Sequence, residues 1–164
     1  MRLNILIAGK AGQGINEISH IIAKSLASIG YYVFNYRDYG SYITGGHNFN
    51  ILSISDAKIN SHEEDFDIVI ALDENAIKKH KLNDKTIVLA SQDYKIKNLI
   101  KIEVEDKRIE NVYFAAALFK VFGMDKEILK KYINKVFSGK SYCRQIWMLL
   151  IKFTRWTAAI IFGL

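Results

Sequence analysis

The chain has 164 residues, of which 50% are hydrophobic and 24% charged; these proportions indicate one globular domain with a sizeable core. The net charge of +6 comes from lysines spread along the sequence, which permits an anionic partner without singling out nucleic acid. The single cysteine, Cys143, excludes an internal disulfide and any iron–sulfur cluster or zinc site that needs several cysteine ligands.

The first predicted element is a buried strand. Residues Leu3–Ala8 form an almost continuous apolar run, which is typical of a strand in a parallel sheet covered on both faces. Met1 and Arg2 lead directly into this strand without a long apolar leader, so we expect a cytoplasmic protein.

A glycine-rich turn follows this strand. Gly9, Gly12 and Gly14 fall within six positions, and the apolar residues after them recur at spacings of three and four, which predicts a helix over 13–28 that stops at Gly30. Backbone N–H groups and the dipole at the start of such a helix favour an anion. The spacing matches neither the dinucleotide fingerprint nor the P-loop. The turn alone therefore leaves two interpretations open, an anion site or an ordinary connection between strand and helix.

A second predicted strand leads into a long polar loop over 37–48. A loop of this length in a compact domain is more often functional than a plain connection. The paired glycines at 45–46 allow the close approach of a ligand or of another backbone, and Tyr39 and His47 offer rings and hydrogen-bonding groups. The alternative is a hairpin turn with surface tyrosines. His47 is not predicted to be a catalytic base, because no acid or cysteine adjoins it in the sequence.

The rest of the chain alternates between strands and helices. Strands are predicted over 31–36, 49–55, 59–61, 66–72, 85–90 and 99–104. Helices are predicted over 73–80, over 110–122 and from Asp125 to a stop at Gly139. The acidic segment His62–Asp65 could ligate a metal, although a solvated loop is the commoner outcome for consecutive acids. The alternation predicts an α/β fold, a three-layer Rossmann-like sheet with helices on both faces.

The last stretch of the sequence differs in character. Residues 145–164 are apolar on every side and nearly long enough to span a membrane, but Lys152 and Arg155 lie in the middle, where each costs about 3 kcal/mol. We therefore divide the chain into a domain over 1–140 and an atypical apolar tail over 141–164. The tail is interpreted as a helix that packs on a missing partner, as a weak membrane anchor, or as a segment foreign to the domain.

Several of these segments, taken in order, resemble the gamma subunit or gamma domain of 2-oxoacid:ferredoxin oxidoreductases. The resemblance covers roughly residues 4 to 139. The Gly-Gly-His-Asn at 45–48 is similar to the fused gamma–alpha chains of the 2-oxoglutarate branch. Family members usually carry an arginine where this chain has Thr44, so an anion contact made by that arginine is in doubt here. The segments that carry the resemblance are 7–15 with its Gly-x-x-Gly-Gln-Gly opening, 30–33, 39–48, 53–56 and 67–73.

The resemblance implies a subunit of an oxidoreductase with no turnover of its own. In the family, thiamine diphosphate decarboxylates a 2-oxoacid, iron–sulfur clusters pass electrons to ferredoxin, and coenzyme A accepts the acyl group. The thiamine and cluster sites lie on other domains, so this chain alone is expected to bind no cofactor or metal and to hold no catalytic residue. Its implied roles are complex assembly and contact with coenzyme A. Its implied partners are alpha, beta and ferredoxin-type subunits, with neither nucleic acid nor membrane.

The candidate cofactor-binding residues come from the glycine turn and from the long loop. They are Gly9, Gly12, Gln13, Gly14, Tyr39, Gly45, Gly46, His47 and Asn48. Two other classes of function remain as alternatives. One is a stand-alone nucleotide-binding α/β module, and the other, suggested by the tail, is a membrane-anchored protein.

Overall fold

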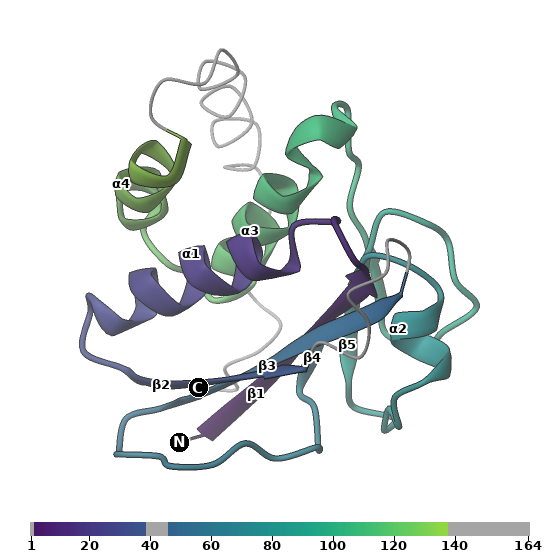
Figure 1. Ribbon diagram of the computed structural model, residues 1–164, viewed down its shortest axis with the longest axis horizontal. Helices are drawn as coiled ribbons and strands as arrows, with labels where there is room; N and C mark the ends of the chain where they lie inside the picture. Colours follow the sequence, from purple (N-terminus) through teal and green to yellow (C-terminus); the bar gives the residue numbers. More distant parts are fainter. Residues whose placement is uncertain (1, 39–45, 138–164) are drawn as a thin grey trace.

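A single twisted sheet with helices on both faces organises the protein (Figure 1). The computed structural model describes residues 2–38 and 46–137. The strands are β1 (Arg2–Lys10), β2 (Tyr32–Asp38), β3 (His47–Ser55), β4 (Ile68–Ala71), β5 (Ile87–Ala90) and β6 (Leu99–Lys101). The helices are α1 (Ile15–Ala27), α2 (Asn75–Lys78), α3 (Glu110–Val121) and α4 (Lys126–Phe137), with a short 3-10 turn η1 (Lys107–Ile109) before α3.

The strand order explains why the sheet is mixed rather than parallel throughout. The described strands lie in the order β2-β3-β1-β4-β5-β6. β1 pairs with β4 in parallel, as its apolar run predicts, but it pairs with β3 antiparallel. Because β2 and β3 form an antiparallel hairpin, β3 enters the sheet between β1 and β2 and runs against both. The apolar run of β1 is typical of a parallel sheet, and the sheet around β1 is parallel on the β4 side and antiparallel on the β3 side.

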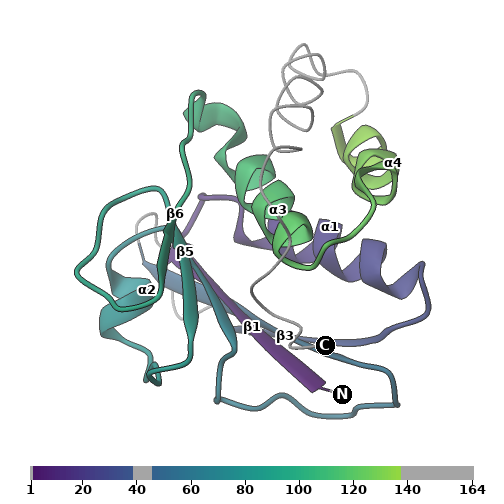
Figure 2. The same ribbon diagram turned by 180° about the vertical axis from the view of Figure 1, so that it is seen from behind.

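The two faces of β1 bury two separate sets of apolar side chains, since successive residues of a strand point to opposite faces. Ile5 and Ile7 belong to the larger core, which the sheet shares with α1, α3 and α4. Figures 1 and 2 show these three helices gathered on the same side of the sheet. Leu6 and Ala8 belong to a smaller core on the opposite face.

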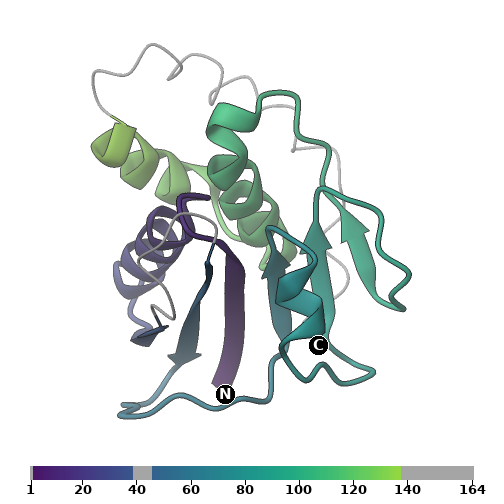
Figure 3. The same ribbon diagram turned by 45° about the vertical axis from the view of Figure 1, so that its right-hand side comes forward.

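The second face has a much thinner cover. In Figure 3 the short helix α2 lies over the sheet on the side away from α1, α3 and α4. Ala76 of α2 joins the smaller core, with Phe66 from the segment that precedes β4. The predicted α/β fold with helices on both faces is thus confirmed, and the helical layer on this face, within the described residues, is one short helix of four residues.

Most predicted elements are present with shifted ends, and one is absent. The segment 59–61 is not a strand. β3, which precedes this segment, and β1 are each paired on both sides, so neither offers it a free edge. The predicted cap of the last helix is confirmed, because the Asp125 carboxylate accepts a hydrogen bond from Glu127 N at 2.9 Å.

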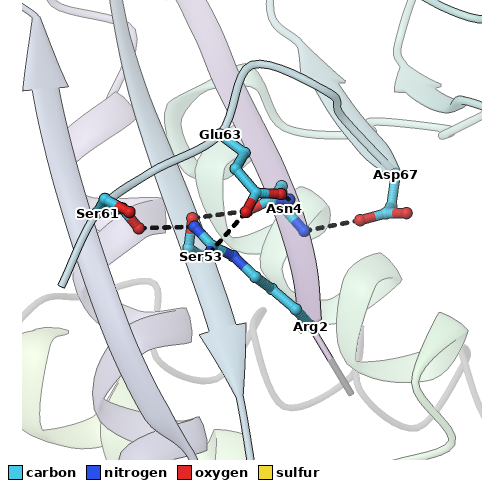
Figure 4. Close-up of polar contacts among 6 residues, drawn as sticks. All are labelled: Arg2, Asn4, Ser53, Ser61, Glu63 and Asp67. Atoms are coloured by element: carbon cyan, nitrogen blue, oxygen red, sulfur yellow. Dashed lines mark hydrogen bonds and ion pairs between the residues drawn. The ribbon is translucent and has the colours of Figure 1, made fainter. Parts of the chain in front are cut away.

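A polar network fastens the connection between β3 and β4 to the amino end of β1 (Figure 4). Asn4 is 5% exposed, and its side-chain oxygen accepts a hydrogen bond of 2.6 Å from the hydroxyl of Ser53, which is fully buried. The Asn4 backbone N–H donates to the Asp67 carboxylate at 2.8 Å. Arg2 lies 2.7 Å from the Glu63 carboxylate. The acidic segment His62–Asp65 was predicted to be either a metal ligand or a solvated loop. In the structure its Glu63 contacts Arg2 and Asn4 at the start of β1, so the segment is bound to the sheet at that residue.

We expect Asn4→Ala to lower the free energy of unfolding by about 1–3 kcal/mol, because the buried Ser53 hydroxyl then has no acceptor. Chemical denaturation measures this loss. The control is the double variant Asn4→Ala with Ser53→Ala, which removes both partners and should cost less than the sum of the two single changes. Strict additivity would show that this hydrogen bond does not couple the two strands.

No helix within residues 2–38 and 46–137 is long and apolar enough to cross a membrane. The apolar tail predicted over 141–164 lies outside the described residues, as do Tyr39, Thr44 and Gly45.

Candidate functional site

The glycine turn between β1 and α1 has a backbone geometry that favours glycine at two positions. Gly12 has a φ of 96° and Gly14 a φ of 79°, both in the left-handed region that favours glycine. Gly14 is the N-cap of α1, and its carbonyl accepts a hydrogen bond from Ile18 N at 3.0 Å. A side chain at Gly12 would meet no atom within 4 Å, so this position faces open space.

Gly9 and Gln13 pack closely together within the turn. A Cβ atom on Gly9 would lie 2.5 Å from the side-chain oxygen of Gln13 and 2.7 Å from Cβ of Leu72. The same Gln13 oxygen accepts a hydrogen bond from Lys10 N at 2.5 Å, and its amide nitrogen donates to the Leu72 carbonyl at 3.1 Å. Gln13 therefore ties the turn to the end of β4.

The end of the long loop is joined to the glycine turn. Ala11 N donates a hydrogen bond to the Gly46 carbonyl at 2.9 Å. Gly9 is the register partner of Asn48 in the β1–β3 pair. The antiparallel course of β3, which the sequence did not predict, is what brings residues 46–48 beside the turn.

A pocket of about 190 Å³ opens where the turn, the first turn of α1 and β3 meet. Gly12, Gly14 and Asn48 are the predicted site residues that line it. Its remaining lining residues were not predicted as site residues: Ala11, Ile15, Asn16, Glu17 and Asn50.

Asn50 forms the polar floor of this pocket. It is 1% exposed, and its amide nitrogen donates to the Asn16 side-chain oxygen at 3.0 Å and to the Ser19 hydroxyl at 2.8 Å. The sequence signal for Asn50 is the two-residue period of a strand, which places it on the same face as Asn48.

The lining of the pocket suits a neutral, hydrogen-bonding group better than a bare anion. The N-terminus of α1 favours negative charge, but the carboxylate of Glu17 lies in the same first turn. Amides both donate and accept hydrogen bonds, as amide and hydroxyl groups of a ligand require. No Lys, Cys or His side chain lines the pocket, so its residues mainly bind and orient a group, and Glu17 is the lining residue whose carboxylate could accept a proton.

His47 faces the other side of the sheet. It shares a face of β3 with Phe49, and its Nε2 lies 2.9 Å from Nε2 of His80, just beyond α2. Burial is the main cause that lowers the pKa of both histidines. Any contact of His47 with a cofactor would have to be made on the face opposite to the pocket. Within the described parts of the chain, no group of three or more His, Cys, Asp or Glu side chains is placed to hold a metal ion.

Comparison with known proteins gives the chain a family match over most of its length. The family model described as pyruvate ferredoxin/flavodoxin oxidoreductase matches residues 4–149. The chain is 36% identical over 89 residues to the 2-oxoacid:ferredoxin oxidoreductase subunit alpha of a Sulfolobus species. It is 30% identical over 112 residues to the subunit of the same name from Saccharolobus solfataricus. These alignments cover 54% and 68% of this chain but only 14% and 16% of the relatives.

Solved structures share the fold at lower sequence identity. The 2-oxoglutarate:ferredoxin oxidoreductase of Magnetococcus marinus, solved with 2-oxoglutarate, coenzyme A and succinyl-CoA bound, aligns with a TM-score of 0.79 and 22% identity over 96% of this chain and 32% of that one. The pyruvate oxidoreductase subunit PORC of Thermotoga maritima aligns with a TM-score of 0.73 and 22% identity over 93% of this chain and 94% of that one. The gamma subunit of a keto/oxoacid ferredoxin oxidoreductase from Geobacter sulfurreducens aligns with a TM-score of 0.71 and 19% identity, over the same shares.

Proposed function

Because this chain belongs to the pyruvate ferredoxin/flavodoxin oxidoreductase family, we propose that it is the gamma domain of a 2-oxoacid:ferredoxin oxidoreductase and works only in complex with the rest of that enzyme. The single observation that carries the proposal is the glycine-turn pocket, formed by motifs that lie far apart in the sequence. The match of the whole fold to a separate gamma subunit supports a domain of this size.

The partners of the chain are proposed to be the alpha, beta and ferredoxin-type portions of one cytoplasmic complex, with ferredoxin as the electron acceptor. The relatives are several times longer than the chain, so most of the enzyme lies outside it. Thiamine diphosphate and iron–sulfur clusters are assigned to those other portions, because one cysteine cannot provide the four ligands that a cluster takes.

Coenzyme A is the ligand that we propose for this pocket, which would hold part of the molecule; coenzyme A supplies the thiol that accepts the acyl group. Gly12 leaves room for the backbone to approach it, and Asn48 presents an amide to its own amide and hydroxyl groups, while Asn50 holds Asn16 in place. Asn16 and Gly14 complete this side of the pocket. In this role the chain binds and orients the acyl acceptor, and its residues perform no proton or electron transfer.

We expect the purified chain alone to reduce no viologen dye with any 2-oxoacid plus coenzyme A, because the pocket has no redox group. Co-expression with the alpha and beta portions should give a complex that co-elutes on gel filtration and reduces the dye. Reduction by the chain alone would contradict the proposal, as would an active complex that forms equally well without the chain.

We expect Gly12→Ala to weaken the binding of coenzyme A to the complex by about tenfold or more, because its Cβ projects into the space left for the ligand. The matched control is Gly30→Ala. Gly30 has a φ of 99°, its Cβ would also meet nothing within 4 Å, and it lies at the far end of α1. Both changes should cost about 1–3 kcal/mol of stability through backbone strain.

Titration of the assembled complex with coenzyme A distinguishes the effect of Gly12→Ala on binding from that of Gly30→Ala. Weaker binding in Gly12→Ala alone would support the pocket as the cofactor site. Equal loss in both variants would point to strain alone, and no loss in either would remove coenzyme A from this pocket.

A further inference from the structure

The edge of the sheet at β2 carries none of the residues that usually keep other strands away. Among the described residues β2 pairs with β3 alone. Natural proteins protect such edges with proline, with lysine or with very short strands. The opposite edge follows this rule, because β6 has three residues and ends in the exposed Lys101. β2 has seven residues without proline or lysine, and its charged residues, Arg37 and Asp38, come only at its end.

Three aromatic side chains form a row along one face of β2. Tyr32, Phe34 and Tyr36 are two residues apart, so they point to the same side of the sheet. That side is the thin one, because Tyr36 lies opposite Ile51 of β3 and packs against the smaller core. The ring of His62 stacks on Tyr36 at a centroid distance of 4.1 Å. The row is therefore anchored to the protein at its Tyr36 end.

The other end of the row is open to solvent. Tyr32 is 50% exposed and Ile29, in the turn before β2, is 43% exposed; within the described part of the chain these are the two exposed large hydrophobic side chains. Phe34 is half-buried, but it belongs to neither of the two cores that the described residues form. Apolar side chains gathered beside a free strand edge indicate a surface that another strand covers.

We propose that β2 is a dimerisation edge, at which a second copy of this chain adds its own β2 in antiparallel pairing centred on Phe34. About this centre the strand is self-complementary. The twofold axis places Phe34 opposite Phe34 of the second copy, and Tyr32 opposite Tyr36 of the second copy. Each aromatic row thus continues into the other, and directly opposed aromatic pairs stabilise antiparallel strands.

The charges of the strand also suit a second copy. In this register Arg37 lies opposite Tyr31 of the second copy and Asp38 opposite Gly30 of the second copy, so no like charges meet across the edge. Arg37 is exposed, and a guanidinium over a tyrosine ring is a favourable contact. An unrelated strand would have to supply this matching pattern, whereas a second copy has it by symmetry.

Dimerisation through β2 needs neither coenzyme A nor the other portions of the enzyme, so the full chain alone is the sample. Sedimentation equilibrium over a concentration series should show a reversible monomer–dimer equilibrium. Phe34→Lys should raise the dissociation constant by about tenfold or more, because two lysine side chains then face each other across the axis. The matched control is Gln92→Lys, which adds the same charge at an exposed position in the segment after β5 and should dimerise as the wild type does.

Cysteine cross-linking tests the register without placing a charge in the sheet. In a Cys143→Ser background, Phe34→Cys should form a disulfide-linked dimer under mild oxidation. Tyr32→Cys, at the half-exposed end of the row, should do so only when it is mixed with Tyr36→Cys, which it faces in the proposed register. Lys101→Cys, on the opposite edge of the sheet, is the control and should remain monomeric.

Cross-linking of Phe34→Cys together with weaker dimerisation of Phe34→Lys would support the β2 dimer. A wild-type chain that stays monomeric over the whole concentration series would overturn it, as would dimers that survive Phe34→Lys or that cross-link through Lys101→Cys. A monomeric wild-type chain whose assembly with the other portions of the enzyme is lost in Phe34→Lys would assign the edge to one of those portions, and would equally overturn dimerisation.

Discussion

Replacement of Phe114 by alanine is expected to lower the free energy of unfolding by about 3–5 kcal/mol, which is the usual cost of truncating a fully buried aromatic side chain. Phe114 lies in α3 and has no exposed surface. It belongs to the larger core, where α3 contacts both α1 and α4. A cavity at this point therefore weakens the layer that holds three helices together.

Urea unfolding followed by circular dichroism measures this loss. Phe114→Leu is the matched control, since it removes fewer atoms and should cost clearly less. For a chain of this size, each kcal/mol lowers the melting temperature by about 2–4 °C. A loss below 1 kcal/mol in Phe114→Ala would show that α3 does not pack on the sheet as described.

Phe114→Ala should also weaken ligand binding in the pocket, because α3 supports one of the glycines that line it. Asn111, one turn before Phe114, lies against Gly14, since its side-chain atoms would be 3.1–3.4 Å from a Cβ built there. Loosening α3 thus removes support behind the N-cap of α1. We expect the binding of coenzyme A to the complex to weaken along with stability in this variant, whereas Asn4→Ala, at the other end of β1, should lower stability alone.

Local patterns predicted the elements well because each pattern reflects a local physical cause. The spacing of five apolar residues from Ile15 to Ile29 predicted α1. Ile15, Ile18, Ile22 and Leu26 are buried, but Ile29 lies beyond the end of the helix and is 43% exposed. The glycine cluster predicted a tight turn between strand and helix, and in that turn Gly12 and Gly14 have positive φ. In both cases the sequence encodes backbone geometry and burial within one short segment.

Arrangements between distant segments were not predictable in the same way. Nothing local reveals that β3 inserts beside β1, and that pairing decides which residues reach the pocket. Asn50 looked like a polar position in an alternating strand, although it forms the polar floor of the pocket. The approach of His47 to His80 depends on the positions of β3 and α2 across the sheet, which sequence spacing does not encode.

Gly9→Ala is the second change with a large expected effect, a loss of about 3 kcal/mol that comes from crowding rather than from backbone strain. Gly9 does not have a positive φ, so alanine is compatible with its backbone. Its new Cβ would, however, lie 2.7 Å from Cβ of Leu72, an atom fixed to the backbone at the end of β4. It would also lie 2.5 Å from the Gln13 oxygen and displace it from Lys10 N.

Gln13 makes this prediction specific, because the displaced side chain should also lose its bond to the Leu72 carbonyl. We therefore expect Gly9→Ala to combine a fall in melting temperature of about 6–12 °C with weaker assembly of the complex. Gln13→Ala in the Gly9→Ala background is the test of cause. Gln13→Ala removes the Gln13 oxygen, which is one of the two groups that the new Cβ crowds. Gln13→Ala should therefore lower the free energy of unfolding by less in the Gly9→Ala variant than in the wild type. Full additivity of the two changes would show that the Gln13 side chain does not fill the space beside Gly9.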